Sequence, residues 1–326
     1  MIDPIISAIC HTENLSAESI QPLDGGQINL IYRINDSCIL RVARTPADSL
    51  RLRQEAALLQ HIRERTGGSI PVPEILAVGE QEGRAYQIQR RIPGQKLHRL
   101  WLQLSPAQKE RVMAQLGAAL ETLHSLPFED FGWFREPEQT YPTWTAYIEP
   151  SFRSALADLA QYSTGVSAPI LDAAARFLEE RLPLLEDSRP VLVHADLWPG
   201  NLLVEGDTLT GMLDFEFAFR APRDYELVLI EDFCLYPNDF VEQDFETRSA
   251  ADYADFFRLL ARHTPDLFAI PNLRQRLDLY HVLFNLQLYA GWRKHNPQAE
   301  ETPYLLAKLA RITNMLFGHG VRMFSE

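Results

Sequence analysis

Apolar and polar residues alternate in short runs over the N-terminal third of the chain, a spacing typical of β-strands. The segments QINLIYRI and SCILRVAR are predicted to be two such strands. A helix is expected over residues 50–65, because apolar residues recur there at helical spacing. Residues 74–92 then read as two strands joined by a turn at Glu82-Gly83. Pro93-Gly94 follows at once, and we place a lobe boundary before it.

Beyond this boundary the apolar spacing becomes helical. Ser105, Pro106 and Gln108 together form a helix-start signal, and the helix they begin is expected to end near His124. A hairpin with a turn at Gly206-Asp207 is expected over residues 202–214, and most of the remaining chain looks helical. The predicted fold class is α+β, with a small β-rich N-terminal lobe (1–92) and a larger, mostly helical C-terminal lobe (93–326).

Composition narrows the possible partners. The 326 residues carry a net charge of −13 and the pI is about 5.2, so nucleic-acid phosphates are not expected to bind. The acidity either favours a cationic partner or serves solubility alone. Three scattered cysteines indicate neither a disulfide framework nor a zinc site. The sequence has no secretory signal or membrane-spanning run, so a cytoplasmic protein without membrane contact is expected.

The segment VLVHADLWPGNLLV places polar residues between two apolar runs. His194, Asp196 and Asn201 lie in it, and Asp214 ends the return strand of the hairpin that follows. Because that hairpin brings the chain back beside the loop, Asp196, Asn201 and Asp214 are expected to converge. Hard oxygen ligands of this kind suit Mg²⁺, and transfer of phosphate from ATP needs Mg²⁺ and a proton acceptor. The alternative is a polar turn in an ordinary hairpin.

Two further features lie in the N-terminal lobe. Glu55 falls on the apolar face of the expected helix, where a carboxylate is costly unless a cation meets it. Arg41 on the preceding strand is the expected cation, and the alternative is that Glu55 pairs with Arg51 on a solvated edge. Upstream, Gly25 and Gly26 precede a strand, where backbone N–H groups could bind phosphates or could simply form a turn.

The combination of HADLWPGN and LDFE resembles the catalytic loop and metal-binding Asp of the aminoglycoside phosphotransferase and choline kinase family. The resemblance covers most of the chain and implies a two-lobed, protein-kinase-like fold that phosphorylates a small molecule with ATP and Mg²⁺. It implies that Asp196 is the catalytic base and that His194 organises the loop. Asn201 and Asp214 would be the Mg²⁺ ligands.

The resemblance also assigns roles in the N-terminal lobe. Gly25 and Gly26 lie where the family has its phosphate loop, and Arg41 lies where a phosphate-binding cation is held by a Glu, here Glu55. The linker that binds adenine through main-chain groups would consist of Gln89, Arg90, Arg91 and Ile92.

Two positions depart from the commonest pattern. Arg41 replaces the usual Lys and, although Arg also binds phosphate, its planar fork is bulkier. This departure keeps a catalytically idle ATP-binding protein as an alternative. Glu216 stands after Asp214-Phe215 where protein kinases have Gly, as is common among small-molecule kinases.

The acceptor is expected to be the hydroxyl of a small molecule rather than of a protein. Ala195 replaces the Arg that protein kinases place between His and Asp, and no APE-like segment follows Asp214. Acidic residues crowd the segment 224–255, which indicates an amine-bearing substrate or else a solvated helix face. Trp198 gives the loop a likeness to fructosamine kinases, or it is a packing residue. A metallohydrolase that uses His194 and Asp196 is a last alternative, although no HExxH motif is present.

Overall fold

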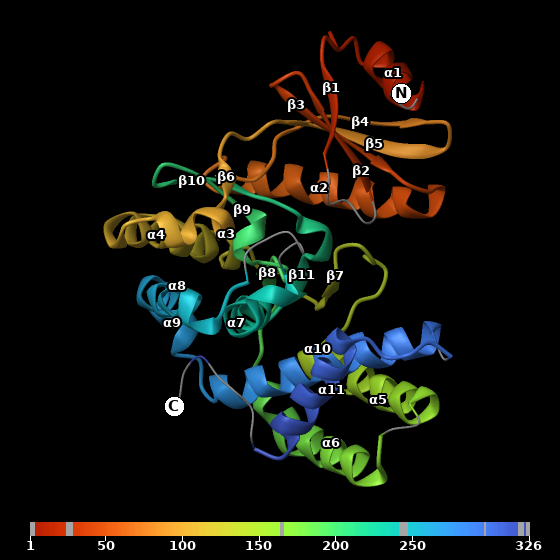
Figure 1. Ribbon diagram of the computed structural model, residues 1–326, viewed down its shortest axis with the longest axis vertical. Helices are drawn as coiled ribbons and strands as arrows, with labels where there is room; N and C mark the ends of the chain where they lie inside the picture. The colour runs from red at the N-terminus through yellow and green to blue at the C-terminus, as the bar shows by residue number, and fades with distance from the viewer. Residues whose placement is uncertain are drawn as a thin grey trace. The chain divides into compact units, whose positions relative to one another are not determined.

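The computed structural model describes residues 4–23, 29–163, 166–240, 247–296, 298–318 and 323. Packing divides the chain into two compact units, each built from several segments. The first unit holds residues 1–126, 133–137 and 199–218, and the second holds residues 127–132, 138–198 and 219–326. The predicted fold class is confirmed, since a β-rich N-terminal region precedes a mostly helical remainder (Figure 1). The lobe boundary after residue 92 stays a prediction.

A five-stranded antiparallel sheet forms the centre of the first unit, with the strands in the order β1-β2-β3-β5-β4. The strands are β1 (Ile20–Leu23), β2 (Asn29–Ile34), β3 (Cys38–Ala43), β4 (Ile75–Gln81) and β5 (Arg84–Arg90). The turn between β4 and β5 falls at Glu82 and Gly83, as predicted. Both residues have positive φ (51° and 74°), which is the conformation of a two-residue hairpin turn.

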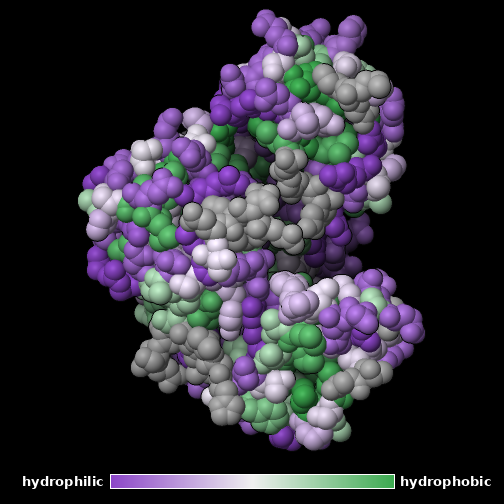
Figure 2. Space-filling model, viewed as in Figure 1, coloured by the Kyte–Doolittle hydropathy of each residue, from purple (hydrophilic) through white to green (hydrophobic). Residues whose placement is uncertain are grey.

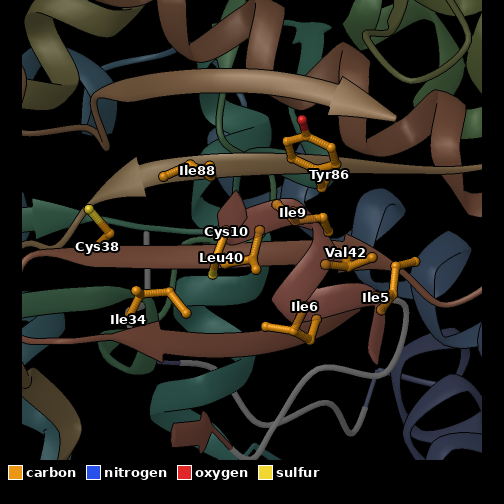
Figure 3. Packing of buried hydrophobic residues seen from close by; sticks show 10 residues of the cluster. All are labelled: Ile5, Ile6, Ile9, Cys10, Ile34, Cys38, Leu40, Val42, Tyr86 and Ile88. Atoms are coloured by element: carbon orange, nitrogen blue, oxygen red, sulfur yellow. The ribbon is translucent and has the colours of Figure 1, made fainter. Parts of the chain in front are cut away.

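Helix α1 (Pro4–Thr12) covers one face of this sheet. Ile5, Ile6 and Ile9 of α1 point toward strand residues such as Leu40 and Val42, and all of them are buried (Figure 3). Each buried Ile contributes about 1.5–3 kcal/mol relative to an exposed one. The apolar side of a short helix is therefore enough to close this face of the sheet.

Helix α2 (Ser49–Thr66) covers the opposite face (Figure 1). Leu52 of α2 packs with Ala43 of β3 and Ala85 of β5. Because successive strand side chains alternate between faces, residues two and four beyond Ala85 share the face of α2. These are Gln87 and Gln89, so two polar side chains share this face with the apolar cluster of Ala43, Leu52 and Ala85.

The rest of the first unit supports a second, smaller sheet. Helices α3 (Leu97–Leu100) and α4 (Pro106–His124) follow the first sheet, and the predicted capping box of Ser105 and Gln108 begins α4. The small sheet has the order β10-β9-β6 and consists of β6 (Gln95–Lys96), β9 (Leu202–Glu205) and β10 (Thr208–Met212). Strands β9 and β10 are the hairpin predicted over residues 202–214.

The second unit is mostly helical. Its helices are α5 (Trp144–Tyr162), α6 (Ala168–Arg181), α7 (Leu227–Leu235), α8 (Ala250–His263), α9 (Pro265–Phe268), α10 (Leu273–His295) and α11 (Pro303–Leu316). Antiparallel strands β8 (Val191–Val193) and β11 (Phe219–Ala221) pair within it, and β7 (Gly132–Trp133) lies where the chain passes from one unit to the other. Trp144 is buried and donates its indole N–H to Tyr280 at 3.0 Å, so α5 and α10 share an aromatic core.

Hydrophilic residues cover most of the face shown in Figure 2, and hydrophobic ones gather only in small patches. Within the described ranges, no helix combines the length and the hydropathy that a membrane crossing requires.

Candidate active site

A buried carboxylate holds the loop that follows β8. His194 donates its main-chain N–H to Glu226 Oε2 at 2.9 Å, and the N–H of Ala195 lies 3.3 Å from Glu226 Oε1. Glu226 is 1% exposed and ends the 3₁₀ turn Arg223–Glu226. A hydrogen bond to a charged group contributes about 1.5–3 kcal/mol, so this one side chain fixes the start of the loop. Glu226 was not among the predicted site residues, because no sequence motif marks it.

The loop contains a strained residue directly before Asp196. Ala195 has a φ of +60°, in the left-handed region that costs a residue with a Cβ about 1–2 kcal/mol. The next N–H, that of Asp196, turns back onto Nδ1 of His194 at 3.3 Å. The His194 ring therefore contacts the main chain of Asp196, which is the kind of contact that an organising residue makes.

Trp198 packs against neighbouring aromatic rings. Its ring centroid lies 5.6 Å from those of both Phe233 and Phe240. This geometry agrees with the packing interpretation of Trp198, and the likeness to fructosamine kinases stays a prediction. Trp198, His194 and Asp196 all belong to the second unit.

The chain enters the first unit directly after Trp198. Asn201 ends the 3₁₀ turn Pro199–Asn201, and its carbonyl accepts the N–H of Leu213 at 2.8 Å. Asp214 comes next, so the hairpin of β9 and β10 returns the chain beside the loop, as predicted. Asn201 and Asp214 line the same cavity, whose volume is about 320 Å³.

Arg41 joins the acidic side chains beside this cavity. Its Nη1 donates to Glu55 Oε1 at 2.6 Å, while Nη2 lies 3.5 Å from Asp214 Oδ1 and 3.9 Å from Glu216 Oε2. The predicted ion pair of Arg41 and Glu55 is present and buried. Burial opposes the charge on Arg41, but the attraction of the three carboxylates outweighs it and raises the pKa of Arg41.

Two carboxylates at the start of the next turn have unusual surroundings. Asp214 has a φ of +66°, and its Oδ1 is buried without a hydrogen-bond partner among the described residues. Burial raises the pKa of Glu216 to about 7, and the charges of Asp214 and Glu55 add to this rise. Strained backbone and unsatisfied polar atoms of this kind gather at functional sites.

The predicted adenine linker lines the cavity. Gln89, Arg90, Arg91 and Ile92 all contribute to its wall. The main-chain N–H of Arg90 is bound to Glu74 O at 2.9 Å, and that of Arg91 to Ser37 O at 2.8 Å. These two donors already have partners, which reduces the main-chain groups that a base can use.

His98 supports the part of the loop that belongs to the first unit. This buried histidine of α3 forms a hydrogen bond to the backbone of Pro199, which must accept through its carbonyl because proline has no N–H. Burial, with the charges of Lys96 and Arg99, lowers the pKa of His98 to about 4, so the ring is neutral near pH 7. His98 was not among the predicted site residues, because a lone histidine on a short helix carries no motif.

Several acidic residues of the segment 224–255 are buried. Among its described residues, three of the four buried acidic ones are ion-paired, and the fourth, Glu226, accepts the main-chain N–H groups described above. Asp224 meets Arg276 at 2.6 Å, Glu231 meets Arg274 at 2.7 Å and Asp232 meets Lys308 at 3.4 Å. Both interpretations offered from the sequence are thus corrected for these three residues, because their carboxylates are buried and each is paired with a cation.

The first unit brings together most of the predicted site residues in one cavity or directly beside it. They are Arg41, Glu55, Gln89, Arg90, Arg91, Ile92, Asn201 and Asp214. His194 and Asp196 lie in the second unit. The predicted phosphate-loop residues Gly25 and Gly26 lie outside the described residues.

The chain has a protein-kinase-like fold. The family model "Phosphotransferase enzyme family" matches residues 19–263, and the chain belongs to this family. The resemblance inferred from HADLWPGN and LDFE is therefore confirmed.

Curated relatives match about half of the chain. Homoserine kinase of Methylocella silvestris is 31% identical over 175 residues, which cover 53% of this chain and 51% of that protein. Hygromycin-B 4-O-kinase of Escherichia coli is 29% identical over 175 residues, covering 52% and 49%. The chain thus spans about half the length of the relatives it matches.

Solved structures match nearly the whole chain. The GDP complex of aminoglycoside 2'-phosphotransferase-IIIa has a TM-score of 0.71 at 16% identity, covering 98% of this chain and 99% of that one. An aminoglycoside phosphotransferase with AMP-PNP and hygromycin B has a TM-score of 0.58 at 20% identity, covering 96% and 99%. At such identities the similarity establishes the fold alone.

Proposed function

We propose that this protein transfers the γ-phosphate of MgATP to a hydroxyl group of a small, amine-bearing molecule. The observation that carries the proposal is that Arg41, paired with Glu55, lies beside Asp214 in a cavity that Asn201 also lines. A cation, a carboxylate and an amide oxygen are the groups that hold a nucleotide phosphate and its metal. Membership of the phosphotransferase enzyme family supports the same reaction class.

The donor set beside the cavity fits Mg²⁺. Asp214 Oδ1 is a buried oxygen without a hydrogen-bond partner in the described part of the chain, and Asn201 adds an amide oxygen. Two protein ligands leave the other positions of an octahedral ion to water and phosphate. When bound, Mg²⁺ supplies positive charge that neutralises the phosphates.

Arg41 would bind phosphate through one nitrogen of its guanidinium group, Nη2. Nη1 is committed to Glu55 at 2.6 Å, whereas Nη2 is 3.5 Å from Asp214, longer than a normal hydrogen bond. The guanidinium is thereby positioned by one partner and keeps a donor for an anion. Relatives with this fold have been captured with GDP, with ADP and with ATP, which supports a nucleotide as the ligand.

Asp196 would orient the acceptor hydroxyl and take up its proton. Glu226 holds the main chain of His194 and Ala195, and the His194 ring contacts the N–H of Asp196, so the loop is rigid before a substrate arrives. General-base catalysis by a positioned carboxylate contributes about 10²- to 10⁴-fold to a rate.

Homoserine is the first acceptor to test. It is a small amine with a free hydroxyl, and several of the curated relatives are homoserine kinases. Hygromycin B, other aminoglycosides, choline-like amines and fructosamines complete the panel, because a hygromycin kinase is also among the relatives. Each acceptor is incubated with MgATP and the purified protein, and ADP release and phosphorylated product are measured.

Replacement of Asp196 by Asn tests the assigned base. We expect phosphotransfer to fall by about 10²-fold or more while MgATP binding is retained. Asp187→Asn is the matched control, because Asp187 is an exposed carboxylate shortly before β8. Full activity in Asp196→Asn would contradict the assignment. ATP binding without transfer to any member of the panel would support the idle-protein alternative instead.

A further inference from the structure

The Arg41 guanidinium has one nitrogen that the ion pair with Glu55 does not serve. Nη1 donates to Glu55 at 2.6 Å, and Nη2 lies 3.5 Å from Asp214. The third nitrogen, Nε, is buried and has no hydrogen-bond partner among the residues that the structure describes. A buried donor on a charged group is destabilising when nothing accepts from it, so an acceptor is needed beside Nε.

Gln87 on β5 carries the matching group. Arg41 of β3 and Gln87 stand directly opposite each other in the pairing of the two strands. Side chains at such positions lie on the same face, with Cβ atoms about 4.5–5.5 Å apart. Gln87 is 0% exposed, and neither its Oε1 nor its Nε2 has a hydrogen-bond partner in the described part of the chain. A buried donor and a buried acceptor that both need a partner thus belong to neighbouring side chains.

Gln87 is set apart from the proposed nucleotide cavity. Arg41 lines that cavity, and Gln87 is not among its lining residues. Gln87 lies instead on the face of the sheet that α2 covers, together with the apolar cluster of Ala43, Leu52 and Ala85. A buried amide in such surroundings is costly unless it is hydrogen-bonded. Pairing with Arg41 explains why this position carries a polar side chain.

We propose that Gln87 Oε1 accepts the Nε–H of Arg41, directly or through one ordered water, and that Gln87 is a positioning residue for the phosphate-binding guanidinium. This inference rests on the proposed function of Arg41. The three nitrogens of a guanidinium lie in one plane. A bond at Nη1 alone lets this plane turn about that bond, whereas a second bond at Nε fixes the plane and the direction of Nη2. Nη2 is the nitrogen that is proposed to bind phosphate.

The proposed contact is specific to arginine at position 41. A lysine side chain ends in a single ammonium group and has no N–H at the position of Nε. A glutamine opposite a lysine would therefore have no such donor to accept from. Arg41 and Gln87 are accordingly expected to act as a pair, so that the effect of changing Gln87 depends on Arg41.

A double-mutant cycle on the full chain tests this pairing, with MgATP affinity measured by calorimetry. We expect Gln87→Met to lower the affinity about 5- to 10-fold, because Nε loses its acceptor and Nη2 its fixed direction. In an Arg41→Lys background the same substitution should change the affinity less than about twofold, because lysine has no Nε–H. Ile88→Met is the matched control and should leave the affinity unchanged, since Ile88 is buried on the opposite face of β5.

The hydrogen bond itself is tested without nucleotide, by ¹H–¹⁵N NMR of the arginine Nε–H groups. The Arg41 resonance is identified as the one that Arg41→Lys removes. We expect this resonance to shift in Gln87→Met and to keep its position in Ile88→Met. Thermal unfolding checks that each variant is folded.

Two results overturn this inference while the proposed function stands. One is an unchanged Arg41 resonance in Gln87→Met. The other is an equal loss of MgATP affinity from Gln87→Met with and without Arg41→Lys. Failure of the wild-type protein to bind MgATP overturns the proposed function instead, and the resonance then still decides whether Gln87 holds Arg41.

Discussion

Replacement of Glu226 by Gln is expected to slow phosphotransfer strongly while ATP binding is largely kept. Glu226 accepts two main-chain N–H groups, from His194 at 2.9 Å and from Ala195 at 3.3 Å. Glutamine keeps one acceptor oxygen but presents its NH₂ group to the other N–H. One charge-assisted hydrogen bond is thus lost, which costs about 1.5–3 kcal/mol.

The lost contact also restrained a strained residue. Ala195 has a φ of +60°, and that conformation costs a residue with a Cβ about 1–2 kcal/mol. This strain is the same in wild type and variant, so the lost hydrogen bond alone destabilises the loop, by about 1.5–3 kcal/mol, and the fraction of molecules with Asp196 in place falls about 10- to 100-fold. The substitution should lower kcat rather than raise KM for ATP. Glu226 belongs to the second unit, whereas all residues that line the proposed nucleotide cavity belong to the first.

Steady-state kinetics of Glu226→Gln would separate these effects. We expect kcat to fall about 10- to 100-fold, with a change in KM for ATP below about threefold. Ala195→Gly in the Glu226→Gln background is expected to recover about 10-fold in kcat, because glycine adopts positive φ without strain. The control is Glu186→Gln, an exposed carboxylate of the same unit. A loss found mainly in KM, or no recovery with Ala195→Gly, would refute this reasoning.

Two further predictions concern electrostatics. Burial opposes the charge on Glu231, but its contacts with His281 and Arg274 outweigh burial and lower the pKa of Glu231 from 4.5 to about 2. The ionised Glu231 therefore stabilises the fold by about 3 kcal/mol above pH 4.5. This stabilisation is lost as the pH falls from 4.5 toward 2. Chemical denaturation should show Glu231→Gln less stable than wild type at pH 7, and the gap should narrow below pH 4.5; a constant gap would contradict the assignment. Separately, Arg41→Lys should weaken ATP binding about 10-fold, because Lys cannot reach all three carboxylates. Adding Glu216→Gly, which removes one of these carboxylates, should reduce that loss in a double-mutant cycle. Strictly additive effects of the two substitutions would count against the coupling.

Elements with a strong local signal were predictable from the sequence. The capping box at Ser105 and Gln108 and the turn at Glu82-Gly83 depend on neighbouring residues, and both occur where expected. The pairing of Glu55 with Arg41 was also predictable, because a carboxylate on an apolar helix face demands a cation. Such features can be predicted because they depend on the local backbone geometry and on the cost of burying a charge, and both follow from residues close together in the sequence.

Other parts of the site depend on contacts between distant residues. Glu226 lies 32 residues beyond His194, and no spacing rule links a carboxylate to a main-chain N–H at that distance. Ala195 and Asp214 adopt positive φ without being glycines, so their conformations are imposed by the surrounding structure. The interpretation of the acidic segment 224–255 was wrong for Glu231 and Asp232 because it also depended on distant residues. The cations that pair with these two carboxylates come from α10 and α11.

The two departures from the commonest kinase pattern explain each other. A lysine ammonium is a single point of charge, whereas the Arg41 fork places Nη1 on Glu55 and Nη2 between Asp214 and Glu216. Glu216 adds a third carboxylate where protein kinases have glycine, and the wider fork spreads one positive charge over all three. Because Nη2 lies 3.5 Å from Asp214 and 3.9 Å from Glu216, a metal ion can take its place beside these carboxylates, and Nη2 can then bind a phosphate, without disturbing the bond to Glu55. Arg41 is therefore compatible with an active phosphotransferase, and the substitution is a weak argument for an idle one.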